Sequence, residues 1–438
     1  MPGHRSPPDV DEADKIAPRP SFAQALAVWA RIGLLSFGGP AAQIALIEHE
    51  VVERRRWVEP RAFMQALNYC MLLPGPEAQQ LATFLGLKLH GVRGAMAAGG
   101  LFVLPGALVL FALSWLAAAG GSWAPVQAMF HGLAPVVAAL VANAVWRLGR
   151  RTLGTPLHLA LAAGAFVALA WLKLDFPWVI GASAAIGALF LKGEPQAEVG
   201  PAPPPMRWGR ELMRLGAYAA IFAVLWAAPV LAAIAIGGRD PFQAVAVFFT
   251  KAAFVTFGGA YAVLPYVADA ATRQYGWLSQ ADMVHGLGLA ETTPGPLILV
   301  TEFVGFFAGW NAAAGGRAGG LSPLGAGALA AALTVWVTFL PCFFYILAGA
   351  PYVERLGRLR RAAGALSAVT AAVVGVIASL GWTLLGVAVL KPGGAGPDWP
   401  AVAVLAAAFA ALRLTRAGPL VLVAGGAVFG LARLALGF

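Results

Sequence analysis

The chain has 438 residues, of which 60% are hydrophobic and only 11% charged, and its formal net charge is +10 at pH 7. Soluble domains carry about a quarter charged residues, so this composition excludes a string of soluble globular domains and predicts an all-α polytopic integral membrane protein. The basic residues stand in short clusters between apolar runs, which indicates membrane topology signals and excludes a nucleic-acid partner.

Residues 1–20 are rich in proline, aspartate and arginine, lack the apolar core of a signal peptide, and are expected to form a disordered cytoplasmic tail. A proline-rich linker over residues 192–211 divides the rest into an N-terminal transporter repeat, 21–191, and a C-terminal repeat, 237–438. The apolar units predicted in the first repeat are 22–47, 63–89, 95–119, 125–146, 156–172 and 176–191. An unpaired transmembrane helix, 212–236, precedes units 242–267, 283–310, 324–350, 366–390, 401–414 and 420–436.

The two repeats share a duplicated stretch, because residues 31–76 and 251–296 align without a gap at an offset of 220. The aligned motifs are Ser36-Phe37-Gly38-Gly39 with Thr256-Phe257-Gly258-Gly259, Trp57 with Trp277, and Pro74-Gly75-Pro76 with Pro294-Gly295-Pro296. Each copy therefore places helix breakers inside apolar sequence, which a membrane protein tolerates where backbone lines a cavity or is buried in protein. Duplicated halves with broken helices are typical of secondary transporters.

The unpaired helix predicts that the second repeat is inverted, because one extra crossing reverses its orientation. The cation clusters at 147–151, in the linker, at 355–361 and at Arg413 and Arg416 then share the cytoplasmic side with the N-terminus, and the C-terminus is periplasmic. About 13 membrane segments are expected, either as thirteen crossings or as nine crossings with four re-entrant hairpins. Residues 54–56 lie on the cytoplasmic side only if the first unit doubles back, which favours hairpins.

The breaks are candidate binding elements. Proline removes a backbone donor and glycine frees the backbone, so Pro74-Gly75-Pro76 ends one half-helix and begins another with free N–H groups. The same reasoning places half-helix starts at Pro40, Ala260 and Pro296. Four helix N-termini with partial positive charge predict an anion site between the repeats. The alternative is that these residues only permit close helix packing.

Charged residues near the breaks suggest two further roles. Arg31 and Lys251 each stand five residues before a break, where a cation costs roughly 2.5 to 3.5 kcal/mol, so they are predicted to neutralise a bound dianion. Alternatively, they reach an interface or pair with carboxylates; the candidate partners are Glu48, Glu77 and Glu302. Proton coupling is predicted for Glu77, Glu291 and Glu302, with structural ion pairs as the alternative.

The full predicted substrate-binding set comprises Arg31, Ser36, Phe37, Gly38, Gly39, Asn68, Pro74, Gly75, Pro76, Gln79, Gln80, Lys251, Thr256, Gly258, Gly259, Tyr261, Thr292, Thr293, Pro294, Gly295 and Pro296. No metal site or cofactor is expected, since Cys70, Cys342 and the histidines lack metal-ligand spacing. No nucleotide-binding motif is present, so ion gradients or the membrane potential must supply the energy.

Several motifs carry a family resemblance. They are Phe37-Gly38-Gly39-Pro40, Trp57, residues 68–83, residues 257–265, and Glu291-Thr292-Thr293-Pro294-Gly295-Pro296. In these motifs the chain resembles the long-chain, two-domain chromate ion transporter family. The resemblance implies a gradient-driven antiporter in the bacterial inner membrane that exports chromate and confers chromate resistance, with sulfate as a related anion.

Other readings of the sequence remain open. The chain is alternatively a transporter of sulfate or another small anion. More remotely it is a membrane-embedded enzyme, although Ser36 and Thr256 lack the adjacent histidine base that a nucleophile needs. The expected partners are the oxyanion and membrane lipid, and a homodimer is a possible assembly.

Overall fold

The computed structural model describes residues 17–121, 123–191, 208–257, 259–352, 360–391, 396–415 and 417–437. These residues form helices joined by short loops, and the described part contains no β-sheet. The predicted all-α polytopic class is therefore confirmed. Most of the expected tail and linker, at residues 1–16 and 192–207, lies outside the described residues, as does Gly258.

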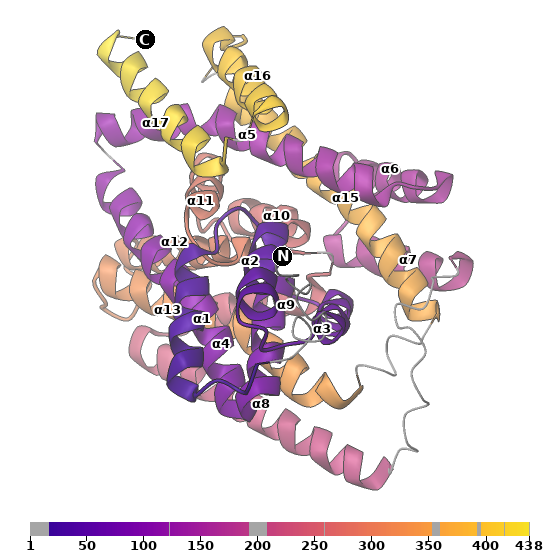
Figure 1. Cartoon of the computed structure of the whole chain (residues 1–438). Coiled ribbons are helices and arrows are strands. Elements are labelled where there is room, and N and C mark those ends of the chain that lie inside the picture. Colours follow the sequence, from indigo (N-terminus) through magenta and orange to yellow (C-terminus); the bar gives the residue numbers. More distant parts are fainter. Residues whose placement is uncertain are drawn as a thin grey trace, which may run out of the picture.

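The helices follow the predicted order of two similar halves (Figure 1). The first half comprises α1 (Phe22–Leu35), α2 (Pro40–Glu48), the π-helical turn η2 (His49–Arg54), α3 (Pro60–Leu72), α4 (Glu77–Gly120), α5 (Ala124–Thr152), α6 (Pro156–Ala170) and α7 (Phe176–Phe190). The unpaired helix is α8 (Trp208–Gly237). The second half comprises α9 (Phe242–Val255), α10 (Ala260–Asp269), the π-helical turn η3 (Ala270–Gln274), α11 (Gln280–Thr292), η4 (Leu297–Leu299), α12 (Val300–Ala314), α13 (Pro323–Gly349), η5 (Ala350–Tyr352), α15 (Arg360–Val389), α16 (Trp399–Leu414) and α17 (Pro419–Ala435).

The long helix α4 is a hairpin of two antiparallel arms. Its backbone leaves the helical region at His90 and Gly91, where Gly91 has a φ of +62° that favours glycine. A Cβ atom on Gly86 would stand 2.3 Å from the carbonyl oxygen of Gly94, so the two arms meet backbone to backbone. In the second half, α12 and α13 form the equivalent hairpin, where a Cβ on Gly309 would stand 2.2 Å from the carbonyl oxygen of Ala326.

The helices on either side of each break also fold back on each other. Tyr69 and Phe84, on opposite sides of the first Pro-Gly-Pro break, have ring centroids 5.8 Å apart, and those of Phe248 and Tyr266 are 5.1 Å apart across the second Phe-Gly-Gly break. A continuous helix would separate each pair by more than about 20 Å. Of the two forms that the sequence left open, the structure has the hairpins.

The two halves are interlocked by their last helices. α5 and α15 pack against each other, α6 and α7 pack on α15, and α16 and α17 pack on α5 (Figure 1). The long helix α5 of the first half is therefore covered by the last two short helices of the second half, and the long helix α15 of the second half by those of the first. Close approach is possible because glycines stand at the contacts, including Gly132, Gly375, Gly426 and Gly430.

Filling one of these contacts is expected to destabilise the interlock. A Cβ on Gly430 would stand 1.8 Å from the carbonyl oxygen of Ala128, whereas one on Gly425 would meet nothing within 4 Å. We expect Gly430→Leu to cost roughly 1 to 3 kcal/mol of stability, as overpacking does. Thermal unfolding in detergent measures this as a lower Tm, with Gly425→Leu as the matched control. Equal Tm values for the two variants would contradict the close packing of α17 on α5.

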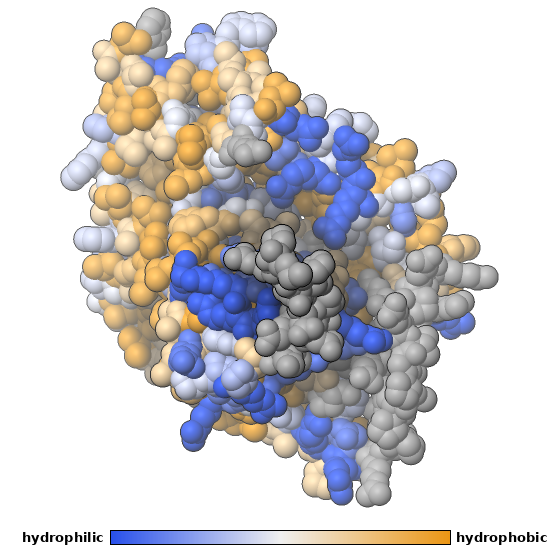
Figure 2. Space-filling view, viewed as in Figure 1, coloured by the Kyte–Doolittle hydropathy of each residue, from blue (hydrophilic) through white to orange (hydrophobic). Residues whose placement is uncertain are grey.

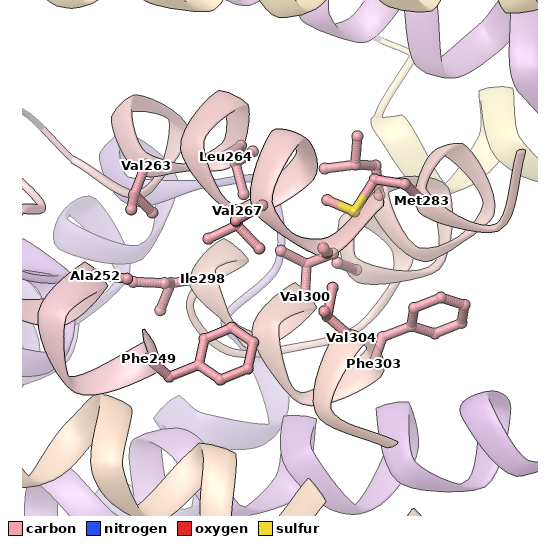
Figure 3. Close-up of a cluster of buried hydrophobic side chains, with 14 of the residues drawn as sticks. Phe249, Ala252, Val263, Leu264, Val267, Met283, Ile298, Val300, Phe303 and Val304 are labelled. Carbon is pink, nitrogen blue, oxygen red and sulfur yellow. The ribbon is translucent and has the colours of Figure 1, made fainter. Parts of the chain in front are cut away.

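The second half has a continuous apolar core around its hairpins. Figure 3 shows this core, in which Phe249 and Ala252 of α9 lie beside Val263, Leu264 and Val267 of α10 and near side chains of α11 and α12. The labelled residues of α11, η4 and α12 are Met283, Ile298, Val300, Phe303 and Val304. Because these side chains are buried, the second pair of breaks is held by dispersion contacts on a rigid support.

Six helical stretches in the described residues are long and apolar enough to cross a membrane. They are residues 77–120, 124–152, 209–237, 297–314, 323–349 and 361–389. The unpaired helix α8 is the least buried of them and runs along the lower edge of the view in Figure 1. Hydrophobic surface covers much of the left edge in Figure 2, as expected for a protein whose sides face lipid.

Candidate functional site at the helix breaks

The four breaks meet through reciprocal backbone hydrogen bonds. The amide of Gly75 donates to the carbonyl oxygen of Thr256 at 2.7 Å, and the amide of Gly295 donates to that of Ser36 at 2.9 Å. The same offset of 220 relates both donors and both acceptors. Each Pro-Gly-Pro break is therefore bonded to the Phe-Gly-Gly break of the other half, as a two-fold relation between the halves requires.

Glycines at this junction are required by space as well as by backbone conformation. Gly75 and Gly295 have φ values of +123° and +91°, which L side chains rarely adopt. A Cβ on Gly75 would stand 2.9 Å from Sγ of Cys342, and one on Gly106 would stand 2.0 Å from the carbonyl oxygen of Pro294. The junction therefore leaves no room for side chains at these positions.

One half-helix N-terminus at the junction has two acidic residues beside its first turn. Oε1 of Glu77 lies 4.0 Å from the position of a Cβ on Gly259, which precedes α10. In the first turn of α10, the hydroxyl of Tyr261 donates to Oε1 of Glu291 at 2.6 Å. Carboxylates are stabilised at the positive end of a helix dipole. The structure thus brings together two of the three predicted proton-coupling residues with the N-terminus of α10.

Two arginines of α5 belong to the same group, and sequence reasoning missed them. The charge of Arg151 acts on the Glu77 carboxyl and that of Arg147 on Glu291. In the sequence they were interpreted as cytoplasmic topology signals. Their spacing of four residues, which places both on one face of a helix, was the available signal.

At the corresponding N-terminus in the first half, that of α2, the sequence equivalents of the acidic residues are not acidic. At the offset of 220, Leu297 replaces Glu77, and Ala41 and Met71 stand where Tyr261 and Glu291 stand in the second half. Gly38 and Gly39 have φ values of +89° and +83°, and a Cβ on Gly39 would meet nothing within 4 Å. Among the described residues, none therefore fills the space beside Gly39.

A buried glutamine links the N-terminus of α2 to the junction. Gln43, 2% exposed, donates from Nε2 to the carbonyl oxygens of Ser36 at 3.1 Å and Gly295 at 2.6 Å. The amide group pairs with the Gly295 carbonyl and adds a second hydrogen bond to the Ser36 carbonyl, which also accepts from the Gly295 amide. It was not among the predicted site residues.

The predicted hydroxyl groups are mostly engaged within their own helix ends. The hydroxyls of Ser36 and Thr256 donate to carbonyl oxygens in α1 and α9, and those of Thr292 and Thr293 donate to carbonyls of α11. They therefore shape the breaks, and only Ser36 also accepts a bond from the other half, from the Gly295 amide at 2.9 Å.

The two predicted glutamines lie fully buried in the first turn after Pro76. Nε2 of Gln80 donates to the carbonyl oxygen of Pro74 at 2.7 Å, and Nε2 of Gln79 donates to the Thr83 hydroxyl at 3.1 Å. Among the described residues, neither side-chain oxygen has a hydrogen-bond partner. Each leaves one polar atom available beside the break.

The other predicted site residues differ in exposure and pairing. Arg31 has a side chain 51% exposed and pairs with Glu50, which was not among the three partners that the sequence offered. Lys251 is exposed and forms no ion pair with a described residue. Glu302 lies in the first turn of α12, 3% exposed. Phe37 is 39% exposed, and Asn68 is half-buried in α3.

A pocket of about 480 Å³ lies near the end of α10 that is remote from Gly259. It is lined by the loop between α6 and α7, by η3 and by α15. Its charged residues include Lys173, Asp175, Asp269 and Arg273. A polar space therefore adjoins the same half-helix that carries the acidic group at its other end.

Comparison with known proteins identifies the family of the chain. A family model described as "Chromate transporter" matches residues 23–188 and again residues 243–431, which agrees with the duplication. A chromate transport protein of Pseudomonas aeruginosa is 33% identical over 83% of this chain and 81% of its own length. A chromate transport protein of Cupriavidus metallidurans is 27% identical over 85% of each chain, and a probable one of Synechococcus elongatus 28% over 84% and 86%. No solved structure matches the chain.

Proposed function

The chain belongs to the chromate transporter family, and from this premise we propose that it is a gradient-driven secondary transporter that exports chromate across the bacterial inner membrane. The relatives with which it shares most of its length are named for chromate transport. Chromate is a tetrahedral oxyanion, and a half-helix N-terminus offers it backbone donors and a favourable dipole.

The observation that carries the proposal is the difference between the two half-helix N-termini at the junction. At the N-terminus of α2, Leu297 and Met71 replace the two carboxylates of the other N-terminus and no described residue fills the space beside Gly39, so this position suits the anion. The N-terminus of α10 holds Glu77 and Glu291, which repel an anion when ionised and not when protonated. A symmetric scaffold thereby supplies one anion position and one proton position side by side.

This arrangement supports coupling through charge. Protonation of Glu77 or Glu291 removes a negative charge close to the bound dianion, and release of the anion favours the ionised carboxylate. Arg147 and Arg151 partly balance the acidic charges. With the N-terminus in the cytoplasm, the pocket lined by Lys173 and Arg273 lies on the periplasmic side and serves as the exit vestibule.

Transport by the purified protein in liposomes tests this function. We expect radiolabelled chromate to move against its gradient when a proton gradient is imposed, and to stop when a protonophore removes that gradient. Protein-free liposomes are the control for leakage. The proposal fails if the protein moves neither chromate nor sulfate under a proton gradient or a membrane potential.

A competition series in the same liposomes identifies the preferred anion. Chromate and sulfate have the same charge and tetrahedral shape, so both are expected to compete for the junction. Stronger inhibition of chromate flux by sulfate than by unlabelled chromate would assign the protein to sulfate. A small organic acid that outcompetes both would assign it to that class instead.

A further inference from the structure

A single buried carboxylate pairs with three arginines just after the C-terminal end of α2. Glu50, in η2, is 2% exposed, and its carboxylate pairs with Arg31 at 3.7 Å, with Arg54 at 3.3 Å and with Arg55. Arg55 also donates to the backbone oxygen of Glu50, and its guanidinium lies 5.5 Å from the ring centroid of Trp57. We call these four charged residues the Glu50 cluster.

The Glu50 cluster has an excess of positive charge and of hydrogen-bond donors. Three guanidinium groups around one carboxylate leave a net charge of +2. Arg55 is 21% exposed and serves as the anchor, whereas the side chains of Arg31 and Arg54 are 51% and 48% exposed. A carboxylate cannot accept from all the donors of three guanidinium groups, so the half-exposed side chains of Arg31 and Arg54 keep donors for another acceptor. Figure 2 shows hydrophilic surface between α1 and α2 in this region.

The second half builds the same turn and keeps only one of these four charges, the cation at the Arg31 position, which is Lys251. At the offset of 220, Glu50 becomes Ala270, Arg54 becomes Gln274 and Arg55 becomes Tyr275, yet η3 has the same π-helical form as η2. Tyr275 stacks on Trp277 with centroids 4.3 Å apart, where Arg55 lies over Trp57 in the first half. The hairpin fold therefore does not require the Glu50 cluster, and its charge serves another purpose.

We propose that the Glu50 cluster is a docking site for a tetrahedral oxyanion dianion on the cytoplasmic side, separate from the junction of the breaks. The planar fork of a guanidinium matches two oxygens of such an anion, and Arg31 and Arg54 present two forks from a fixed base. Arg31 precedes Ser36 by five residues, about 8 Å along a helix, and Glu50 follows Pro40 by ten residues, about 15 Å along a helix, so a docked anion is roughly 8 to 15 Å from the N-terminus of α2.

This inference rests on the proposed function, because it assigns an entry site to the exported anion. Residues 54–56 lie on the cytoplasmic side in the proposed topology, where an exporter collects its substrate. Positive charge at an entrance raises the local concentration of an anion, so its loss affects capture more than turnover. A phospholipid head group offers the same phosphate-like chemistry and is the alternative source of the ligand.

Kinetics in everted membrane vesicles, which expose the cytoplasmic face, test the site. For Arg31→Gln/Arg54→Gln we expect the KM for chromate to rise about 10-fold at low ionic strength, with Vmax within about 2-fold of wild type, and the difference to shrink as salt is added. Lys88→Gln/Arg93→Gln, at the exposed turn of α4, removes the same charge and is the matched control. An unchanged KM in the Arg31/Arg54 variant would overturn the docking site.

Equilibrium binding separates this inference from the proposed function. Sodium chromate is titrated into purified protein in nanodiscs of neutral phosphatidylcholine. We expect the double variant to bind chromate about 10-fold more weakly than wild type, and Arg54→Gln alone to show a smaller loss of affinity. The control variant is expected to bind chromate with wild-type affinity. This result stands even if wild-type protein proves unable to transport. Equal binding by all variants overturns the docking site, and so does a difference that appears only in discs containing phosphatidylglycerol, which would assign the cluster to lipid.

A stability measurement guards against misfolding as the cause. Arg31→Gln/Arg54→Gln retains the Glu50–Arg55 pair and is expected to keep the wild-type Tm, whereas Glu50→Gln leaves three arginines without their carboxylate and is expected to lower it. If the double variant does not fold, Arg31→Lys/Arg54→Lys is used instead, because lysine keeps the positive charge but lacks the planar guanidinium group. Its KM is then expected to rise and its Tm to stay unchanged, and an unchanged KM overturns the proposal.

Discussion

Replacing Glu77 or Glu291 by glutamine is expected to uncouple chromate movement from the proton gradient. Both carboxylates lie at the N-terminus of α10, Glu77 near Gly259 and Glu291 bonded to Tyr261. Glutamine keeps the size of the side chain but cannot release a proton, so the anion position no longer senses protonation. Since a hydrogen bond to a charged group is worth about 1.5 to 3 kcal/mol, gradient-driven flux is expected to fall roughly 10- to 100-fold.

The measurement is chromate flux in liposomes with a proton gradient and a membrane potential imposed separately. We expect each variant to lose the response to the proton gradient and to keep chromate exchange at equal pH on both sides. Tyr261→Phe removes the partner of Glu291 and is expected to weaken the response partially. Asp240→Asn, in an exposed ion pair with Arg317, is the control for loss of a carboxylate. Wild-type coupling in both Glu77→Gln and Glu291→Gln would exclude the acidic group as the proton site.

Replacing Gly106 by leucine is expected to abolish transport by displacing a break. A Cβ at this position would stand 2.0 Å from the carbonyl oxygen of Pro294, so the second Pro-Gly-Pro break cannot remain in place. Its displacement breaks the hydrogen bonds from Gly295 to Ser36, which join the two halves. Overpacking of this kind costs roughly 1 to 3 kcal/mol, and the loss of junction geometry adds to it.

Transport and thermal unfolding together test this effect. Gly106→Leu is expected to have no measurable chromate flux and a lower Tm. Gly100→Leu, in the same arm of α4, is the matched control because a Cβ there would meet nothing within 4 Å. Wild-type flux in Gly106→Leu would mean that the breaks need not meet for transport.

Local chemistry made much of the fold predictable. Pro74-Gly75-Pro76 and Gly38-Gly39 interrupt helices because proline lacks a donor and glycine adopts positive φ, and the structure ends helices at both places. The repeat at an offset of 220 also identified which residues are equivalent. The hairpin form was one of two alternatives, since apolar length alone does not show whether a broken unit turns back.

The candidate site was predictable only in part. Ser36, Gly75, Thr256 and Gly295 come together as expected, because breakers mark them in the sequence. Arg31 was expected to serve at the breaks, and the structure pairs it with Glu50. A cation's partner depends on how the hairpin folds, which sequence spacing does not reveal.

By itself, the sequence determined the membrane class, the duplication and the positions of the breaks, because composition, repetition and the backbone chemistry of proline and glycine are local properties. Only the tertiary structure decided which break meets which, and that Glu77 and Glu291 lie at one half-helix N-terminus while no described residue fills the space beside Gly39 at the other. The bonds from Gly295 to Ser36 join residues 259 positions apart. Contacts of that kind depend on how whole helices pack, and no local pattern encodes them.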